Sequence, residues 1–340
     1  MPIVPVDNRE DTMRHTIFGS IAALVIAGLT ASAGPTAAQE HSLRIGSVQA
    51  ENDPIIRGFN EFKRLVEERS NGRIEILVYP NGQLGDTQEV QDQALAGGNV
   101  AAFTDPNLLA TFKPEFGIIG APYVFESYED ADRFTSSQTF KKWAEDLRAE
   151  SGFVTLAFNW YQGPRNLMTK KPIASRADVN GLRIRTPGAP VWVAAGKALG
   201  GTPTPMAWGE VYSALQLGAI DGVESQPSGA VGSKFHEVTT HVTKTEHIHL
   251  ITGIVVGDLW WKTLSPEDQA LVQEAAVEGG RFMSNLVVGQ LEQDFAKMQA
   301  AGVTISDIDK AEFKAAAAVE LEALGLMPAL EAVRSELGRN

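Results

Sequence analysis

Segments with the pattern of β-strands alternate with segments with the pattern of α-helices along most of this chain. Between residues 43 and 105 the order is strand, helix, strand, helix, strand, with helices expected over 53–72 and 85–98. Both helical segments have an aspartate at or near the start, in the position of an N-cap, and glycine at the end. This alternation predicts an α/β fold, in which helices cover both faces of a parallel or mixed sheet.

One helix is expected over 127–152. A second series of alternating segments follows, with helices expected over 190–200 and 208–218. The chain has 340 residues, whereas a single hydrophobic core stops growing near roughly 250 to 300 residues. We therefore expect two lobes with a cleft between them. The first lobe is expected to hold 39–160 and part of 248–300, and the second 161–247 and part of 248–340.

Three long segments are expected to connect these lobes. A strand over 153–169 is interrupted by Gly163 and Pro164, which makes it a natural hinge. The β-branched run over 241–258 is long enough to cross back to the first lobe. A helical pattern over 265–300, opened by serine and proline, predicts one long helix that spans both lobes.

The N-terminus has the pattern of a secretory signal peptide. A basic residue, Arg14, precedes a short apolar run and then several small residues. We expect a signal peptide over 1–38, with Met13 as a possible start and cleavage after Ala38 or, as the rival, Ala33. A retained N-terminal anchor is the alternative. The signal peptide predicts a mature protein in the periplasm.

The composition excludes several classes of protein. The net charge is −13 and there is no run of lysine or arginine, so nucleic acid and anionic membranes are not expected partners. Cysteine is absent, which excludes disulfides and thiolate chemistry. The G-x-S-x-G, P-loop, G-x-G-x-x-G and H-E-x-x-H motifs are missing as well. We expect no cofactor, no enzymatic activity and no segment of the mature protein embedded in a membrane.

Four histidines lie close together in the sequence, which raises the question of a metal site. They are His236, His241, His247 and His249. Their spacing matches no standard set of metal ligands, and Glu246 is expected to face away from His247 and His249. We therefore expect ordinary strand and loop histidines and no metal.

Two arginines occupy alternate positions of the predicted strand over 181–187. Arg185 lies near the carboxyl end of that strand, where open α/β sheets bind ligands, whereas Arg183 is expected to pair with an acidic side chain. Arg165 follows the interruption in the hinge strand. A guanidinium matches a carboxylate with two parallel hydrogen bonds. Arg165 and Arg185 therefore predict an organic-anion site in the cleft, with structural ion pairs as the alternative.

Asp105 also ends a predicted strand, directly before Pro106. This position predicts a contact to a ligand at the edge of the sheet. An aspartate before a proline is equally typical of a helix N-cap, so both roles stay open.

Four segments together resemble one family. They are "YPNGQLGD" (79–86), "APYVFESYEDA" (121–131), "GLRIRTPGAP" (181–190) and the block "PMAWGEVYSALQLGAIDGVESQ" (205–226). They are similar to the substrate-binding proteins of the tripartite ATP-independent periplasmic (TRAP) transporters, the DctP family. The resemblance implies a two-lobed periplasmic-binding-protein fold, and a receptor that delivers an organic acid to the TRAP permease subunits. A sensor for a membrane receptor and, less favoured, a secreted organic-acid enzyme are the alternatives.

The resemblance also implies roles for particular residues. Arg185 corresponds to the arginine that holds the ligand carboxylate, Arg165 to a second arginine of the anion site, and Trp208 to an aromatic residue that lines the cleft. Ser225 stands where relatives commonly have an asparagine that contacts the carboxylate. Asp105, which the resemblance does not assign, is included in the expected ligand site because of its position at the end of a strand.

Tryptophan and tyrosine residues near these positions indicate what kind of ligand the cleft could hold. Trp160, Tyr161, Trp192 and Trp208 are expected to supply flat apolar walls, which suit a smaller or more apolar carboxylate. Core packing is the alternative for Trp160 and Trp192. The sequence leaves open which organic acid is bound.

Overall fold

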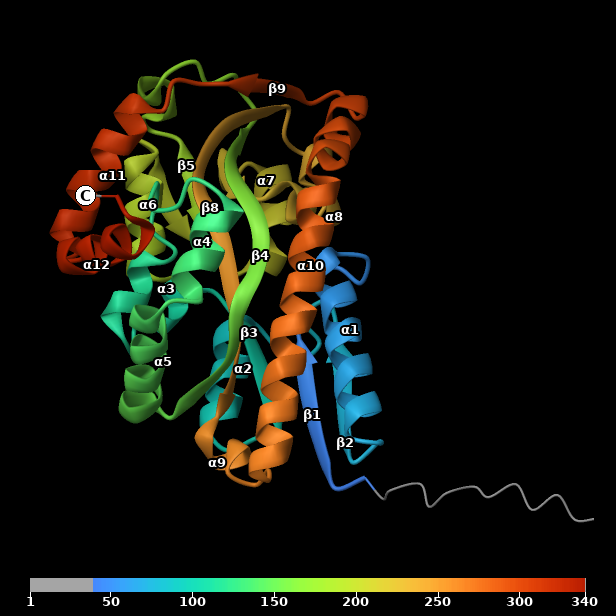
Figure 1. The fold of residues 1–340 in the computed structure, drawn as a ribbon. Helices are drawn as coiled ribbons and strands as arrows, with labels where there is room; N and C mark the ends of the chain where they lie inside the picture. Colours follow the sequence, from blue (N-terminus) through green and yellow to red (C-terminus); the bar gives the residue numbers. More distant parts are fainter. Residues whose placement is uncertain (1–38, 340) are drawn as a thin grey trace, which may run out of the picture. The chain divides into compact units, whose positions relative to one another are not determined.

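The computed structural model describes residues 39–339, so the predicted signal peptide over 1–38 lies outside the described residues. Residues 39–339 form one mixed sheet of nine strands flanked by helices, which confirms the predicted α/β class (Figure 1). No helix in this part of the chain combines the length and the apolar character needed to cross a membrane.

The sheet has the strand order β2-β1-β3-β8-β4-β7-β5-β6, and β9 pairs with β8. Strands β4 and β8 are antiparallel to each other, while β1 is parallel to β2 and β3, and β5 is parallel to β6 and β7. The strands are β1 (His41–Gly46), β2 (Ile74–Tyr79), β3 (Val100–Thr104), β4 (Phe153–Thr169), β5 (Arg183–Thr186), β6 (Thr202–Pro205), β7 (Gly222–Ser225), β8 (His241–Gly257) and β9 (Thr304–Asp307).

The helices expected over 53–72, 85–98, 190–200, 208–218 and 265–300 are all present, whereas one other expected helix is divided. The segment expected as a single helix over 127–152 forms two, because the Ser137 side chain accepts a hydrogen bond from the Phe140 N–H and so caps a new helix. The α-helices are α1 (Pro54–Arg69), α2 (Thr87–Leu95), α3 (Pro106–Leu109), α4 (Tyr128–Thr135), α5 (Gln138–Ser151), α6 (Pro190–Ala198), α7 (Val211–Leu217), α8 (Pro227–Gly232), α9 (Asp258–Trp261), α10 (Pro266–Ala300), α11 (Ala311–Ala323) and α12 (Met327–Leu337). The part of the chain that the structure describes also contains four 3-10 helices, η1 (Pro114–Ile118), η2 (Arg176–Val179), η3 (Trp208–Glu210) and η4 (Phe235–Glu237).

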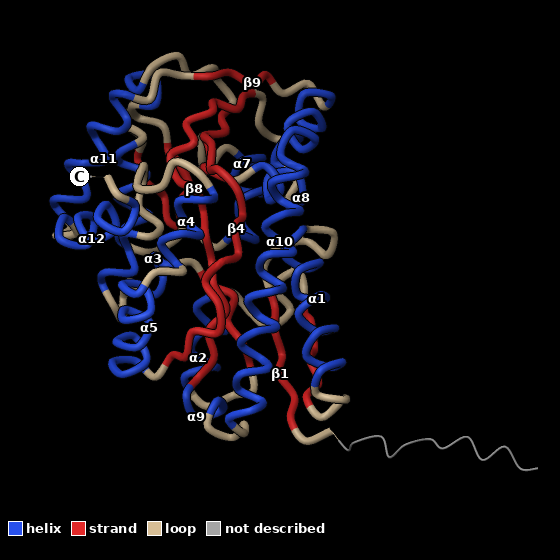
Figure 2. The backbone as a smooth tube through the Cα atoms, viewed as in Figure 1, coloured by secondary structure: helices blue, strands red, loops and turns tan. Residues whose placement is uncertain are grey.

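Strands β4 and β8 run through both lobes (Figure 2). The amino-terminal part of β4 and the carboxyl-terminal part of β8 lie with β1 to β3 in the first lobe, and their other parts lie with β5 to β7 in the second. Their register shifts at several points, and Gly163 in β4 has a φ of 102°, in the left-handed region that glycine adopts readily. These are the hinge strands that the sequence predicts.

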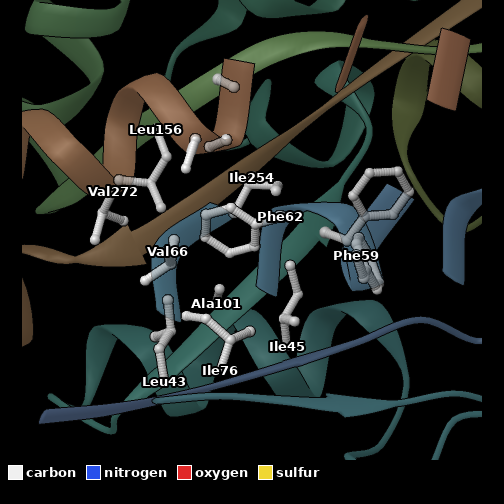
Figure 3. Close-up of a cluster of buried hydrophobic side chains, with 14 of the residues drawn as sticks. Leu43, Ile45, Phe59, Phe62, Val66, Ile76, Ala101, Leu156, Ile254 and Val272 are labelled. Carbon is white, nitrogen blue, oxygen red and sulfur yellow. The ribbon is translucent and has the colours of Figure 1, made fainter. Parts of the chain in front are cut away.

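Separate hydrophobic clusters stabilise the two lobes. In the first lobe, Leu43 and Ile45 of β1 pack with Phe59 and Phe62 of α1 and with Ile254 of β8, all of them buried (Figure 3). In the second lobe a further cluster joins β7, α7 and the end of α10. The 35-residue helix α10 packs on α1 in the first lobe and on α8 in the second, as predicted for a helix that spans both (Figure 1).

Helix α10 lies against β4 at a glycine. A Cβ at Gly280 would come 2.4 Å from Asn159 Oδ1 and 2.8 Å from Trp160 Nε1. The indole of Trp160 also donates a hydrogen bond to the Ala276 carbonyl of α10, at 3.1 Å. A side chain at position 280 would therefore force the helix and the strand apart.

This close approach leads to a testable prediction. Gly280→Ala is expected to lower the free energy of unfolding by about 1 to 3 kcal/mol through overpacking, although alanine is normally the better helix former. The control is Gly289→Ala in the same helix, where no described atom beyond the helix backbone lies within 4 Å of an added Cβ. Gly289→Ala is expected to raise the free energy of unfolding by about 0.5 to 1 kcal/mol, because alanine loses less conformational entropy on folding than glycine. Urea unfolding measures both, and equal shifts would contradict the packing argument.

Candidate ligand-binding site

A cavity of about 370 Å³ lies between the two lobes. Several of its polar lining residues lie at or directly after the carboxyl ends of strands β1, β3, β5 and β7, as is typical of ligand sites in α/β sheets. The hinge strands contribute the remaining wall. Its polar and aromatic lining includes Ser47, Gln49, Phe103 and Asp105 from the first lobe, Arg165, Arg185, Trp192, Trp208 and Gln226 from the second, and Gln162 and Thr252 from the hinge strands.

Arg185 is a buried cation that forms no ion pair with any described carboxylate. Its side chain is 4% exposed, and its Nε and Nη2 donate to the Met206 carbonyl at 3.1 and 2.8 Å. Its guanidinium carbon lies 5.3 Å from the ring centroid of Trp208. Burial lowers the pKa of Arg185 to about 10, so the group is still charged at neutral pH. Two of its five N–H groups bond Met206, which leaves three for a ligand.

Arg165 is buried as well, but its charge is matched. Its Nε and Nη2 both donate to the Glu224 carboxylate, Nη2 also donates to the Glu224 carbonyl at 2.7 Å, and Nη1 donates to Gln226 Oε1 at 2.7 Å. Burial alone would raise the pKa of Glu224, but the Arg165 charge and hydrogen bonds from His247 and Arg165 outweigh it and lower that pKa. One of the five N–H groups of Arg165 is left for a ligand. The two arginines of the cavity are therefore not equivalent.

A chain of hydrogen bonds ties Arg165 to the hinge strands. Gln226, which accepts from Arg165, donates through Nε2 to Gln162 Oε1 at 2.8 Å. Gln162 in turn donates to Thr252 Oγ1 at 3.2 Å, and Thr252 donates to the Trp160 carbonyl at 2.7 Å. No sequence pattern singled out Gln226, Gln162 or Thr252 as site residues. Gln226 could have been found, since it directly follows β7 at the same edge of the sheet as Arg185.

Asp105 is the N-cap of α3, which is one of the two roles that the sequence left open, and it also lines the cavity, where contact with a ligand stays a prediction. Its Oδ1 caps α3 by accepting from the N–H groups of Asn107 and Leu108, at 2.9 and 3.2 Å. The same oxygen accepts from Trp192 Nε1 at 3.1 Å, and the residue lines the cavity. Burial raises the pKa of Asp105, while these three donors and the charge of Arg165 oppose that shift.

The remaining predicted site residues divide between the cavity and the core. Trp208 lines the cavity, and its indole donates to Ser233 Oγ at 3.0 Å. Ser225 is buried and its hydroxyl donates to the Gln226 carbonyl at 3.0 Å; the structure does not bring its side chain to the cavity. Adjacent residues of an extended chain point to opposite sides, which explains why Gln226 faces the cavity instead.

The four aromatic residues expected to line the cavity do not all lie there. Trp192 lines the cavity beside Arg165, whose guanidinium carbon is 4.8 Å from its ring centroid. Trp160 is fully buried in the core of the first lobe, which is the alternative that the sequence left open. Tyr161 does not line the cavity, and its hydroxyl is 2.8 Å from His249 Nδ1. Only Trp192 and Trp208 of the four supply cavity walls.

Other charged groups near the site have partners within the protein. Arg183 forms an exposed ion pair with Asp221, Nε to Oδ2 at 2.9 Å, which confirms the predicted pairing. His247 is buried between Thr245 and Glu224, and burial lowers its pKa. Residues 39–339 contain no group of three histidine, aspartate or glutamate side chains placed to hold a metal ion.

Two α/β lobes joined by crossing strands, with an unmatched buried cation in the cavity between them, define a solute-binding protein. A model of the family described as bacterial extracellular solute-binding protein, family 7, matches residues 45–324. The chain belongs to this family, and the resemblance to TRAP solute-binding proteins is confirmed.

Relatives and solved structures agree with this assignment. The C4-dicarboxylate-binding periplasmic protein DctP of Rhodobacter capsulatus is 30% identical over 86% of this chain and 87% of its own length. An apo open structure of a TRAP periplasmic solute-binding protein from Escherichia fergusonii has 41% identity and a TM-score of 0.78, covering 87% of this chain and 99% of that one. A structure from Actinobacillus succinogenes with bound L-galactonate has 29% identity and a TM-score of 0.84, covering 88% and 100%.

Proposed function

We propose that this protein is a periplasmic receptor that binds an organic acid between its lobes and delivers it to the membrane permease of a TRAP transporter. The observation that carries the proposal is Arg185, a buried guanidinium in the cavity with three free N–H groups and no carboxylate partner among the described residues. An unmatched buried charge is costly, and a ligand carboxylate would remove that cost.

The proposed ligand contacts follow from the hydrogen bonds that are still available. Arg185 binds the carboxylate, the free N–H of Arg165 adds to it, and Trp208 covers the guanidinium and the ligand. Asp105 faces the ligand from the first lobe. Ser225, whose hydroxyl holds the Gln226 carbonyl, acts by positioning Gln226 rather than by direct contact.

Binding is proposed to close the lobes about β4 and β8. The moving bodies are 39–160 with part of 248–300, and 161–247 with part of 248–340. The higher TM-score with the galactonate-bound relative than with the apo open one, despite lower sequence identity, supports a conformation near the liganded one. A ligand that contacts both lobes stabilises the closed state through contacts made only there.

We also propose that the protein is exported to the periplasm and that it has no enzymatic activity. Residues 1–38 are proposed to direct export to the periplasm and to be removed there. Capture and release of the acid require no bond to be made or broken, so no enzymatic activity is proposed.

A thermal-shift screen tests this function. The purified protein is heated with dicarboxylates, aldonates, uronates, 2-oxo acids and aromatic acids in turn. An acid present at about 100 times its Kd is expected to add about 2.7 kcal/mol to the free energy of unfolding and so to raise Tm. Mass spectrometry should recover that acid unchanged. A flat screen would contradict the receptor function, and a converted acid would favour an enzyme.

A further inference from the structure

Two buried arginines and the carboxyl groups of Glu224 and Asp105 lie in or next to the lining of the cavity, and only one ion pair joins them. Among its lining residues, Asp86, Asp105, Arg165 and Arg185 are titratable, and Asp86 is exposed to solvent. Glu224, which does not line the cavity, forms an ion pair with Arg165. One cation of the second lobe, Arg185, and one carboxyl group of the first lobe, Asp105, are left facing the ligand.

Asp105 is held rigidly with one oxygen free. Three N–H donors converge on Oδ1, from Asn107, Leu108 and Trp192, and these hydrogen bonds to the carboxylate oppose the rise of the Asp105 pKa that burial causes. Its Oδ2 has no hydrogen-bond partner among residues 39–339. The carboxylate cannot turn away from the cavity without losing the cap of α3 and the bond to Trp192.

Gln49 presents a second free acceptor from the same lobe. It lines the cavity, is 6% exposed, and its buried Oε1 has no partner among the described residues. A buried acceptor without a donor is costly. The first lobe therefore lines the cavity with Asp105, which has a free carboxylate oxygen, and with Gln49, whose enclosed amide oxygen lacks a donor, whereas Arg185 of the second lobe offers donors.

On this basis, and resting on the receptor function proposed above, we propose that the site selects acids with a single carboxylate and hydroxyl groups at the opposite end. Arg185 binds the carboxylate, and hydroxyl groups donate to Asp105 and Gln49. Asp105 is the specificity-determining residue, because a second carboxylate placed against it would meet a like charge and bring no proton to either acceptor. Dicarboxylates are thereby rejected.

Calorimetric titration at pH 8 with matched acids tests the selection. The two acids of each pair have the same carbon skeleton. One end of the first acid is a CH2OH group, and the same carbon of the second acid is a carboxylate. The pairs are glycerate and tartronate, gluconate and glucarate, and galactonate and galactarate. The monocarboxylate of at least one pair is expected to bind roughly 100-fold or more tightly than its dicarboxylate partner, since like-charge contacts in an interface are strongly unfavourable.

Asp105→Asn isolates the cause of that selection. Asparagine caps a helix as well as aspartate and keeps an oxygen for the Asn107 and Leu108 N–H groups, so the fold is retained. The ratio of affinities is expected to fall to within about tenfold, mainly because dicarboxylate binding improves once the like charge is gone. The matched control is Asp53→Asn, which alters the N-cap of α1 in the same lobe outside the cavity lining and should leave the ratio unchanged.

Other results would overturn the selection without overturning the receptor. Equal affinity of the wild type for both members of a pair, or an unchanged ratio in Asp105→Asn, would show that Asp105 does not discriminate. If no hydroxylated monocarboxylate bound while another acid from the thermal-shift screen did, the ligand class would be wrong and the receptor function would stand.

Discussion

Replacing Arg185 with alanine is expected to weaken binding of the acid found in the screen by roughly 30-fold to several thousand-fold, or about 2 to 5 kcal/mol. The ligand carboxylate would enter a buried cavity whose remaining arginine is already bound to Glu224. It would therefore lose its bulk-water hydration without gaining a matched charge. Calorimetric titration measures the change in Kd, and circular dichroism checks that the variant is folded.

Two further variants show whether the guanidinium itself is responsible. Arg185→Lys is also expected to bind poorly, since an ammonium lacks the planar set of donors that matches a carboxylate. Arg183→Ala removes the other arginine of β5, which is exposed and paired with Asp221, and should leave Kd unchanged. A Kd for Arg185→Ala equal to that of the wild type would rule out the proposed carboxylate contact.

The ligand-free Arg185→Ala protein provides an independent check. An unmatched buried cation is unfavourable in the folded state, so its removal offsets the loss of the two hydrogen bonds to Met206. The free energy of unfolding is therefore expected to change far less than the free energy of binding. A large loss of stability would indicate that Arg185 has a structural role instead.

Local patterns were sufficient to predict the architecture. Aspartates 53, 86 and 105 each cap a helix, and the hinge strands and the long helix lie where periodicity placed them. These features depend on residues close together in the chain, so a single sequence contains the information. The break between α4 and α5 was missed because a serine cap inside a helical pattern gives only a weak signal.

The two arginines show where such patterns stop being sufficient. Position near the end of a strand predicted that Arg185 faces the cavity, and it does. The same reasoning could not show that Arg165 is matched by Glu224, which is 59 residues away and becomes its neighbour only because β7 pairs with β4. The hydrogen bonds among Gln226, Gln162 and Thr252 likewise form only because strands far apart in the sequence pair with one another.

The Glu224 and Arg165 pair leads to the second large prediction. Glu224→Ala is expected to lower the free energy of unfolding by about 3 to 5 kcal/mol, because Arg165 would remain buried without a partner and His247 would lose its hydrogen bond. Both side chains of the pair are almost completely buried, at 4% and 0% exposure, so water cannot replace the carboxylate. The urea midpoint measures the loss.

Two comparisons identify the buried charge as the cause. Glu224→Gln keeps the shape and an acceptor for Arg165 but removes the charge, and its loss of stability should be intermediate. Arg183→Ala breaks an ion pair of the same lobe whose partners are 45% and 35% exposed, and pairs of that kind contribute about 0 to 1 kcal/mol. If Glu224→Ala shifted the urea midpoint no more than Arg183→Ala does, Arg165 would have to find another partner or water in the folded protein. It would then be free to bind a second carboxylate, and the charge balance assigned to the cavity would be wrong.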